Sequence, residues 1–264
     1  MRGIFRKADL TTAAGTYADL VNQLPETDLE PVSSIGSVTD GKMDMFYGVV
    51  EADADQAGEY YLSSTKQTDA TGTTGKYIAF DLFLKVDQKT TIYMTANSKV
   101  SFAGDSDKGL QNAARVAFVT EGSATVDKSP DEMRKLALAT GTAKIWEPNY
   151  DVHTAAGVAA ARDTYQVTTS TTNGSQIPYY GIKAVIPAKT IPMKQVTTAN
   201  PSETYFVDYK TTAANTSTVQ FAELAAGVTK IRVYMWVEGQ DVDCENSASG
   251  TDIKFDLQFT ATAP

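Results

Sequence analysis

The chain has 264 residues, 42% of them hydrophobic, which is enough for one large domain or two small ones. Its formal net charge is −9 and its 23 lysines and arginines are scattered, so we expect neither nucleic acid nor an anionic membrane as a partner. A single cysteine excludes an internal disulfide, so packing and hydrogen bonds must stabilise the fold.

The first 40 residues differ from the rest, because they are polar, rich in turn-forming residues and weakly periodic. We predict an extended N-terminal arm over residues 1–40 and a sandwich domain over residues 41–264. The arm holds six apolar residues that could become buried against a neighbouring subunit: Ile4, Phe5, Leu10, Tyr17, Leu20 and Val21. It lacks the long apolar core of a signal peptide, and no later stretch has 18 consecutive apolar residues, so we expect no membrane insertion.

Beyond residue 40, short apolar or alternating runs are separated by clusters of Gly, Asn, Asp, Ser and Thr, as in antiparallel sheets. The predicted strands cover residues 43–52, 59–65, 76–86, 90–102, 114–122, 143–147, 164–170, 179–186, 203–209, 218–224, 230–239 and 252–262. About a dozen strands favour an all-β fold, namely a single large β-sandwich that is jelly-roll-like. Two smaller sandwiches that meet near residues 125–145 are the alternative.

Two of these strands differ in pattern. Residues 76–86 are almost continuously apolar, so we predict a strand deep in the sandwich in which Asp81 needs a polar partner. Residues 252–260 alternate, and this pattern predicts one wet face and one buried face. The buried face is predicted to carry Ile253, Phe255, Leu257 and Phe259.

Two short helices are predicted between the strands. In residues 129–138, Ser129 can cap the helix, Pro130 suits its first position, and Glu132 can complete a capping box. Residues 153–165 are rich in alanine, with Thr154 as the predicted N-cap. The small side chains of this second helix indicate close packing on a sheet or on a neighbouring subunit.

The only histidine, His153, follows two acidic residues, Glu147 and Asp151. Carboxylates and an imidazole are ligands for a divalent metal, so these three residues form a candidate metal site. A lone histidine cannot build the usual zinc site, and we therefore prefer a structural turn.

Residues 235–250, "MWVEGQDVDCENSASG", contain Trp236 and Cys244 among several carboxylates. The carboxylates of Asp241 and Asp243 should raise the pKa of the Cys244 thiol, which makes it a poor nucleophile. Both aspartates can instead accept hydrogen bonds from nearby backbone, so we predict an ordered polar loop that closes a hairpin.

Trp236 is out of phase with the apolar Val233, Met235 and Val237 of the same strand. We therefore expect Trp236 to cover the second face of its sheet or an interface.

Calcium is a further alternative, since residues 53–58 and 104–109 place acidic residues close together in loops. An EF-hand counted from Asp53 or Asp105 needs a carboxylate at its twelfth position, where Ser64 and Val116 stand. Solvated turns are the preferred interpretation. We thus predict no cofactor, with a looser Ca²⁺ site left open.

A carbohydrate-binding surface requires exposed aromatic rings, and Tyr150, Tyr179 and Tyr180 lie next to predicted loops. A carbohydrate-binding module is therefore one candidate function. Enzymatic activity is not expected, because the chain shows one histidine, no cofactor motif and no activated nucleophile.

Residues 77–85, 112–122 and 144–154 resemble uncharacterised β-sandwich proteins of bacteria and their mobile elements. Residues 231–261 are similar to the closing hairpin of the TasA and camelysin-like fibre proteins. The resemblance implies a jelly-roll-like subunit that assembles by adding strands between neighbours. Such fibre proteins carry an export leader, whereas we expect none in this sequence, which opens with Met1.

These observations predict a structural subunit that assembles with copies of itself, and with other structural proteins of the same assembly. A virion capsid or decoration protein, assembled in the host cytoplasm, is the preferred identity because it needs no leader. A secreted TasA-like surface or biofilm fibre, extracellular after removal of a leader, is the alternative.

Overall fold

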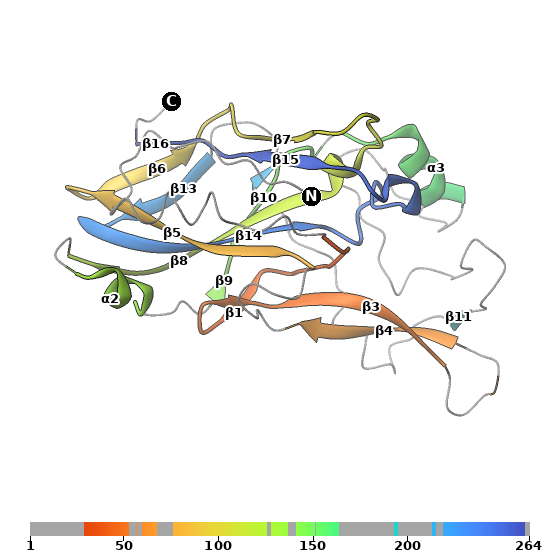
Figure 1. Ribbon diagram of the computed structural model, residues 1–264, viewed down its shortest axis with the longest axis horizontal. Coiled ribbons are helices and arrows are strands. Elements are labelled where there is room, and N and C mark those ends of the chain that lie inside the picture. Colours follow the sequence, from red (N-terminus) through yellow and green to blue (C-terminus); the bar gives the residue numbers. More distant parts are fainter. Residues whose placement is uncertain are drawn as a thin grey trace.

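The computed structural model describes residues 29–52, 57, 60–67, 76–125, 128–136, 141–150, 152–163, 193–194, 213–214 and 219–261. These residues form an all-β sandwich with two α-helices at its periphery, which confirms the predicted fold class (Figure 1). The finer jelly-roll connectivity stays a prediction.

A five-stranded sheet lies at the centre of the molecule. Its strands, in spatial order, are β12 (Ala213–Ala214), β10 (Lys144–Glu147), β8 (Ala114–Ala124), β14 (Gly227–Val237) and β5 (Ile78–Val86). All neighbours are antiparallel except β10 and β12. Because β5 and β8 from the first half of the chain flank β14 from the second half, two separate sandwiches meeting near residues 125–145 are ruled out.

Further strands cover both faces of the central sheet, so the described chain has three layers (Figure 1). One outer layer contains β6 (Thr90–Met94), β13 (Val219–Leu224) and β16 (Phe259–Thr260), together with the pair β7 (Lys99–Phe102) and β15 (Ile253–Asp256). The other contains β1 (Ser37–Thr39), β2 (Lys42–Met43) and β9 (Gly141–Thr142), and also β3 (Met45–Ala52), β4 (Tyr60–Gln67) and β11 (Met193–Lys194).

Every residue of β14 is buried, because this strand has a hydrophobic core on each of its faces. Val233, Met235 and Val237 belong to the larger core, which the β6 and β7 layer closes. Tyr234 and Trp236 belong to a second core, which the β1 and β3 layer closes. The alternation in β14 therefore places Trp236 on the second face of the sheet, as the sequence predicts.

The predicted alternation of residues 252–260 is also confirmed, since all four apolar residues of the inner face are buried. This stretch forms two strands rather than one: β15 pairs with β7, and β16 pairs with β6. Its outer face is drier than predicted, because Asp256 is 3% exposed. Neither β15 nor β16 pairs with β14, whose partners are β5 and β8, so the predicted closing hairpin is wrong. The loop after β14 instead connects the central sheet to the outer layer that contains β15.

The prediction that residues 76–86 form a strand deep in the sandwich is wrong. Strand β5 is the terminal strand of the central sheet among the described residues, and Phe80 and Leu82 are only partly buried. Asp81 does find polar partners, as predicted: Arg232 donates a hydrogen bond of 2.8 Å, and the ammonium group of Lys230 lies 3.4 Å away.

Residues 29–40 belong to the folded body, although the sequence assigns them to the arm. Val32 is 1% exposed and Val38 is 3% exposed, and both contribute to the second core. The backbone of Val32 bonds to Val237 and Gly239, beside the end of β14. The predicted boundary at residue 40 therefore falls inside the sandwich. The six apolar arm residues, Ile4 to Val21, lie outside the described residues.

Both predicted helices are present. Helix α2 (Pro130–Arg134) begins with the expected capping box, in which Ser129 and Glu132 exchange hydrogen bonds. Helix α3 (Ala155–Asp163) is preceded by Thr154, whose hydroxyl accepts a hydrogen bond from the backbone N–H of Gly157, as expected of an N-cap. Two short 3₁₀ helices, η1 (Leu110–Ala113) and η4 (Asn246–Ala248), complete the described elements. The predicted strands at 164–170, 179–186 and 203–209 lie outside the described residues.

Candidate functional site

The loop that follows β14, residues 238–252, is called the closing loop. It meets the start of β8, the end of β10 and the start of α3. Six ionisable side chains gather there, and we call this group the polar centre: Arg115, Glu147, His153, Glu238, Asp241 and Asp243. Each of these side chains is buried, with His153 only 3% exposed. Two groups of residues that the sequence singles out separately therefore come together here. They are Glu147 with His153 from the candidate metal site, and Asp241 with Asp243 from the closing loop. Asp151 lies outside the described residues.

Arg115 is the cation of the polar centre. Its Nη2 atom lies 2.6 Å from Asp241 Oδ2 and 2.6 Å from Glu147 Oε1, and all three side chains are 0% exposed. Its Nη1 atom donates to the carbonyl oxygens of Asn112 and Ala114, both at 3.1 Å. One guanidinium therefore joins the closing loop to two strands, through a hydrogen bond to Asp241 and a close ion pair with Glu147.

Asp243 connects the closing loop to helix α3. Its Oδ1 atom accepts hydrogen bonds from the backbone N–H of Thr154 at 2.8 Å and from the Thr154 hydroxyl at 2.6 Å. A carboxylate at this position also complements the positive end of the helix. Gly157 permits the close contact, because a Cβ at this position would lie 2.5 Å from the carbonyl oxygen of Val242.

His153 pairs with the other oxygen of the same carboxylate, since its Nδ1 atom lies 2.9 Å from Asp243 Oδ2. An aspartate–histidine pair can serve as an acid–base dyad when the second ring nitrogen reaches a substrate. Here Nε2 is buried and has no hydrogen-bond partner among the described residues. The pair holds the start of α3 against the closing loop.

Glu238 links the closing loop to the N-terminal residues of the described chain. Its Oε1 atom accepts hydrogen bonds from the Ser33 hydroxyl at 2.5 Å and from the backbone N–H of Gln240 at 3.2 Å. Its Oε2 atom accepts a hydrogen bond of 3.1 Å from the indole nitrogen of Trp236. Neutral donors hold this carboxyl group, so it can be protonated without losing an ion pair.

The polar centre holds four carboxyl groups but only one permanent cation, and this imbalance favours proton uptake. Burial raises the pKa of Glu238, against the opposing effects of the Ser33 hydrogen bond and of Arg115. Burial also raises the pKa of Asp241, although Arg115 opposes the shift. Burial lowers the pKa of His153, but the hydrogen bond to Asp243 and the surrounding carboxylates raise it by more.

These directions predict a protein that becomes less stable as the pH rises. A group whose pKa is higher in the folded state stabilises the fold fully below its unfolded pKa, and this contribution is lost as the pH rises through the folded pKa. The contribution of Glu238 is therefore full below about pH 4.5 and that of His153 below about pH 6.5. We expect the free energy of unfolding, measured with urea, to fall as the pH rises above about 4.5 and further as it rises above about 6.5, the ordinary pKa values of these two groups.

The variant Glu238→Gln is the control for this pH dependence. It keeps one side-chain oxygen, which can still accept from Ser33, but loses the acceptor for Trp236 because its second terminal atom is an NH2 group. It also removes the titrating group, so its unfolding free energy should change less steeply with pH. A wild-type protein whose stability rises over the same pH range contradicts the expected charge state of the polar centre.

The metal hypothesis can be compared with this geometry. His153, Asp241 and Asp243 each offer a ligand atom, and these atoms lie within 4.8 Å of one another. However, both oxygens of Asp243 already accept or share hydrogen bonds, and Arg115 supplies a cation to Asp241 at 2.6 Å. A metal ion would have to displace these contacts, so the geometry favours a framework of ion pairs and hydrogen bonds.

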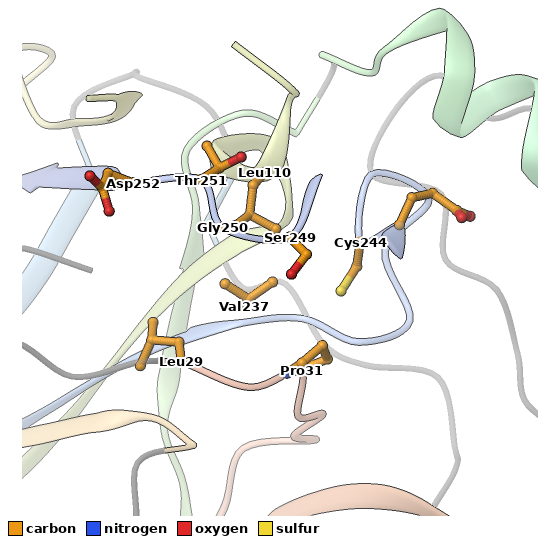
Figure 2. A pocket seen from close by; sticks show the side chains of 10 residues that line it. Leu29, Pro31, Leu110, Val237, Cys244, Ser249, Gly250, Thr251 and Asp252 are labelled. Atoms are coloured by element: carbon orange, nitrogen blue, oxygen red, sulfur yellow. The ribbon is translucent and has the colours of Figure 1, made fainter. Parts of the chain in front are cut away.

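Cys244 lies at the edge of the polar centre and is half-buried. Burial and the neighbouring carboxylates of Asp241 and Glu238 raise the pKa of its thiol well above the ordinary range. The thiolate that a nucleophile requires is therefore disfavoured, in agreement with the sequence-based prediction. Cys244 also lines a cavity of about 560 Å³, which Figure 2 shows beside Val237 and the closing loop.

Two other groups of sequence candidates fall elsewhere. Asp107 Oδ1 accepts hydrogen bonds from the backbone of Gly109 and the side chain of Gln111, and acts as a turn residue. Tyr150 is partly buried, whereas Tyr179 and Tyr180 lie outside the described residues.

Sequence reasoning missed Arg115, Glu238 and Ser33. Arg115 and Glu238 each interrupt an apolar stretch, "ARVAFV" and "MWVEG", and a charge in a buried strand indicates a buried partner. The charge within each apolar stretch could have been noticed in the sequence, but the sequence does not show which residue is the buried partner. Ser33 gave no signal, because it lies among polar turn residues.

Comparison with known protein families, curated proteins and solved structures gave no match. No helix in the described part of the chain is both long enough and apolar enough to cross a membrane.

Proposed function

We propose that the protein is a non-enzymatic structural subunit that self-assembles into an ordered array. The observation that carries the proposal is that the side chains of the polar centre make structural contacts. Its carboxylates, imidazole and guanidinium bind one another and the backbone, and they join segments as distant as residues 33 and 238 or 115 and 241. These are the contacts of a fixed building block, because the side chains most suited to chemistry hold the closing loop in place.

The preferred identity is a capsid or decoration protein of a virion, assembled in the host cytoplasm from copies of this chain. The three-layer, strand-rich body supports this identity, since it supplies a rigid subunit with a buried central strand. A secreted surface or biofilm fibre is the second candidate. The sequence resemblance of residues 231–261 to TasA and camelysin-like fibre proteins favours it, although β14 and β15 of this segment do not pair as a hairpin.

Electron microscopy of the purified full-length protein separates these candidates. Closed shells or capsomers support the virion protein, and filaments support the fibre. Reproducible turnover in a screen for glycosidase and esterase activity, lost on replacement of an acidic residue, would instead overturn the non-enzymatic proposal. A specific hit on a glycan array would favour the carbohydrate-binding module.

A further inference from the structure

The cavity beside the closing loop has an apolar floor and an acidic rim. Among the described residues, its apolar lining comes from three separate segments, with Leu29, Pro31, Leu110, Val237 and Cys244. Its polar rim consists of Glu245, Ser249, Gly250, Thr251 and Asp252. Figure 2 shows Leu29 and Pro31 facing Leu110 and the 249–252 segment across the cavity. A volume of about 560 Å³ lies in the range of pockets that enclose a ligand.

One segment of the chain has the matching chemistry. Residues 1–7, "MRGIFRK", place two large apolar side chains, Ile4 and Phe5, between the cationic Arg2 on one side and Arg6 and Lys7 on the other. Apolar side chains suit the floor of the cavity, and the flanking cations suit the carboxylates of the rim. Within residues 1–28 this is the one stretch in which adjacent large apolar residues are flanked by cations on both sides.

The place where the described chain begins supports the same pairing. Leu29, the first described residue, is itself on the cavity wall, and residues 1–28 precede it directly in the sequence. The connection from residue 7 to residue 29 can span roughly 70 Å when fully extended, which is enough to reach a neighbouring subunit. We propose that the cavity beside the closing loop is the docking site for residues 1–7 of a neighbouring copy of the chain.

This inference rests on the proposed self-assembly, because it needs a neighbouring copy. It predicts that the only cysteine, Cys244 on the cavity wall, is protected when subunits assemble. Alkylation of Cys244 in the full-length protein is measured by mass spectrometry in dilute and in concentrated solution. At nine-tenths occupancy the concentrated protein should react about tenfold more slowly, because only the open fraction reacts.

A pair of charge reversals distinguishes a neighbour's segment from the chain's own. The arm variant carries Arg2→Glu, Arg6→Glu and Lys7→Glu, and the rim variant carries Glu245→Lys and Asp252→Lys. Each variant alone brings like charges together and should lose the protection of Cys244. A mixture of the two variants restores opposite charges only between different molecules, so protection should return in the mixture.

A matched control variant, Asp87→Lys, reverses an exposed charge on the turn that follows β5 and should leave the protection unchanged. If the thiol of Cys244 reacts too slowly to follow, Ser249→Cys in a Cys244→Ser chain supplies a second reporter on the exposed rim.

The outcomes separate this inference from the proposed function. Assemblies in which Cys244 reacts as fast as in dilute protein overturn the docking site and leave self-assembly standing. Protection that is independent of concentration and does not return in the mixture shows docking within one chain, and also overturns the proposal. A protein that stays monomeric at every concentration overturns the proposed function itself.

Discussion

Replacement of Arg115 with methionine is expected to lower the free energy of unfolding by about 3–5 kcal/mol. The methionine keeps much of the side-chain volume, but Glu147 and Asp241 lose the cation that lies 2.6 Å from each of them. Both carboxylates are 0% exposed, so water cannot replace the guanidinium. Urea unfolding of the variant and the wild type at neutral pH measures the difference.

Two controls test the cause of this loss. Lys89→Met removes a cation from an ion pair with Glu223 that is 72% and 54% exposed, and should cost at most about 1 kcal/mol. Adding Glu147→Gln and Asp241→Asn to the Arg115→Met chain removes the unpaired charges and should recover part of the stability. An Arg115→Met variant no less stable than Lys89→Met contradicts the buried ion pairs.

Replacement of Trp236 alone with alanine is expected to lower the free energy of unfolding by about 3–5 kcal/mol. Trp236 is 0% exposed and lies in the second core, where the β1 and β3 layer packs on β14. Its removal leaves a cavity in this core and takes the indole donor from Glu238 Oε2. Thermal and urea unfolding followed by circular dichroism measure the loss, since this method does not depend on the tryptophan.

Trp236→Phe divides this effect into its two parts. The phenyl ring fills most of the space but cannot donate a hydrogen bond, so the loss should be smaller, about 1–3 kcal/mol. Equal stability of the alanine and phenylalanine variants would mean that the packing of Trp236 contributes little. That result would contradict a second core on this face of β14.

Local features of the fold could be predicted from the sequence, because short-range patterns determine them. The capping box of α2 depends on Ser129 and Glu132 alone, and the faces of β14 follow from alternation. The depth of β5 could not be predicted in the same way. Both β5 and β14 are long apolar strands, and the pairing of β14 with β8 as well as with β5 decides which of them is central.

The candidate site was predictable in fragments. The sequence singles out residues 147–153 and 236–244 as separate acidic stretches, and each of them contributes to the polar centre. The two stretches are brought together by Arg115, which pairs with Asp241, 126 positions away in the chain. Nothing local to either stretch encodes that contact. The closing loop is the exception, since Asp241 accepts a hydrogen bond from the backbone of Asp243 as predicted.

The account predicts above all that full-length copies of this chain bind one another to form an ordered assembly. Sedimentation velocity over a wide range of protein concentration tests this claim most directly. We expect a monomer in dilute solution to be replaced, as the concentration rises, by one large species of defined size. A single monomer species at every concentration, from a protein that unfolds cooperatively, would contradict the account.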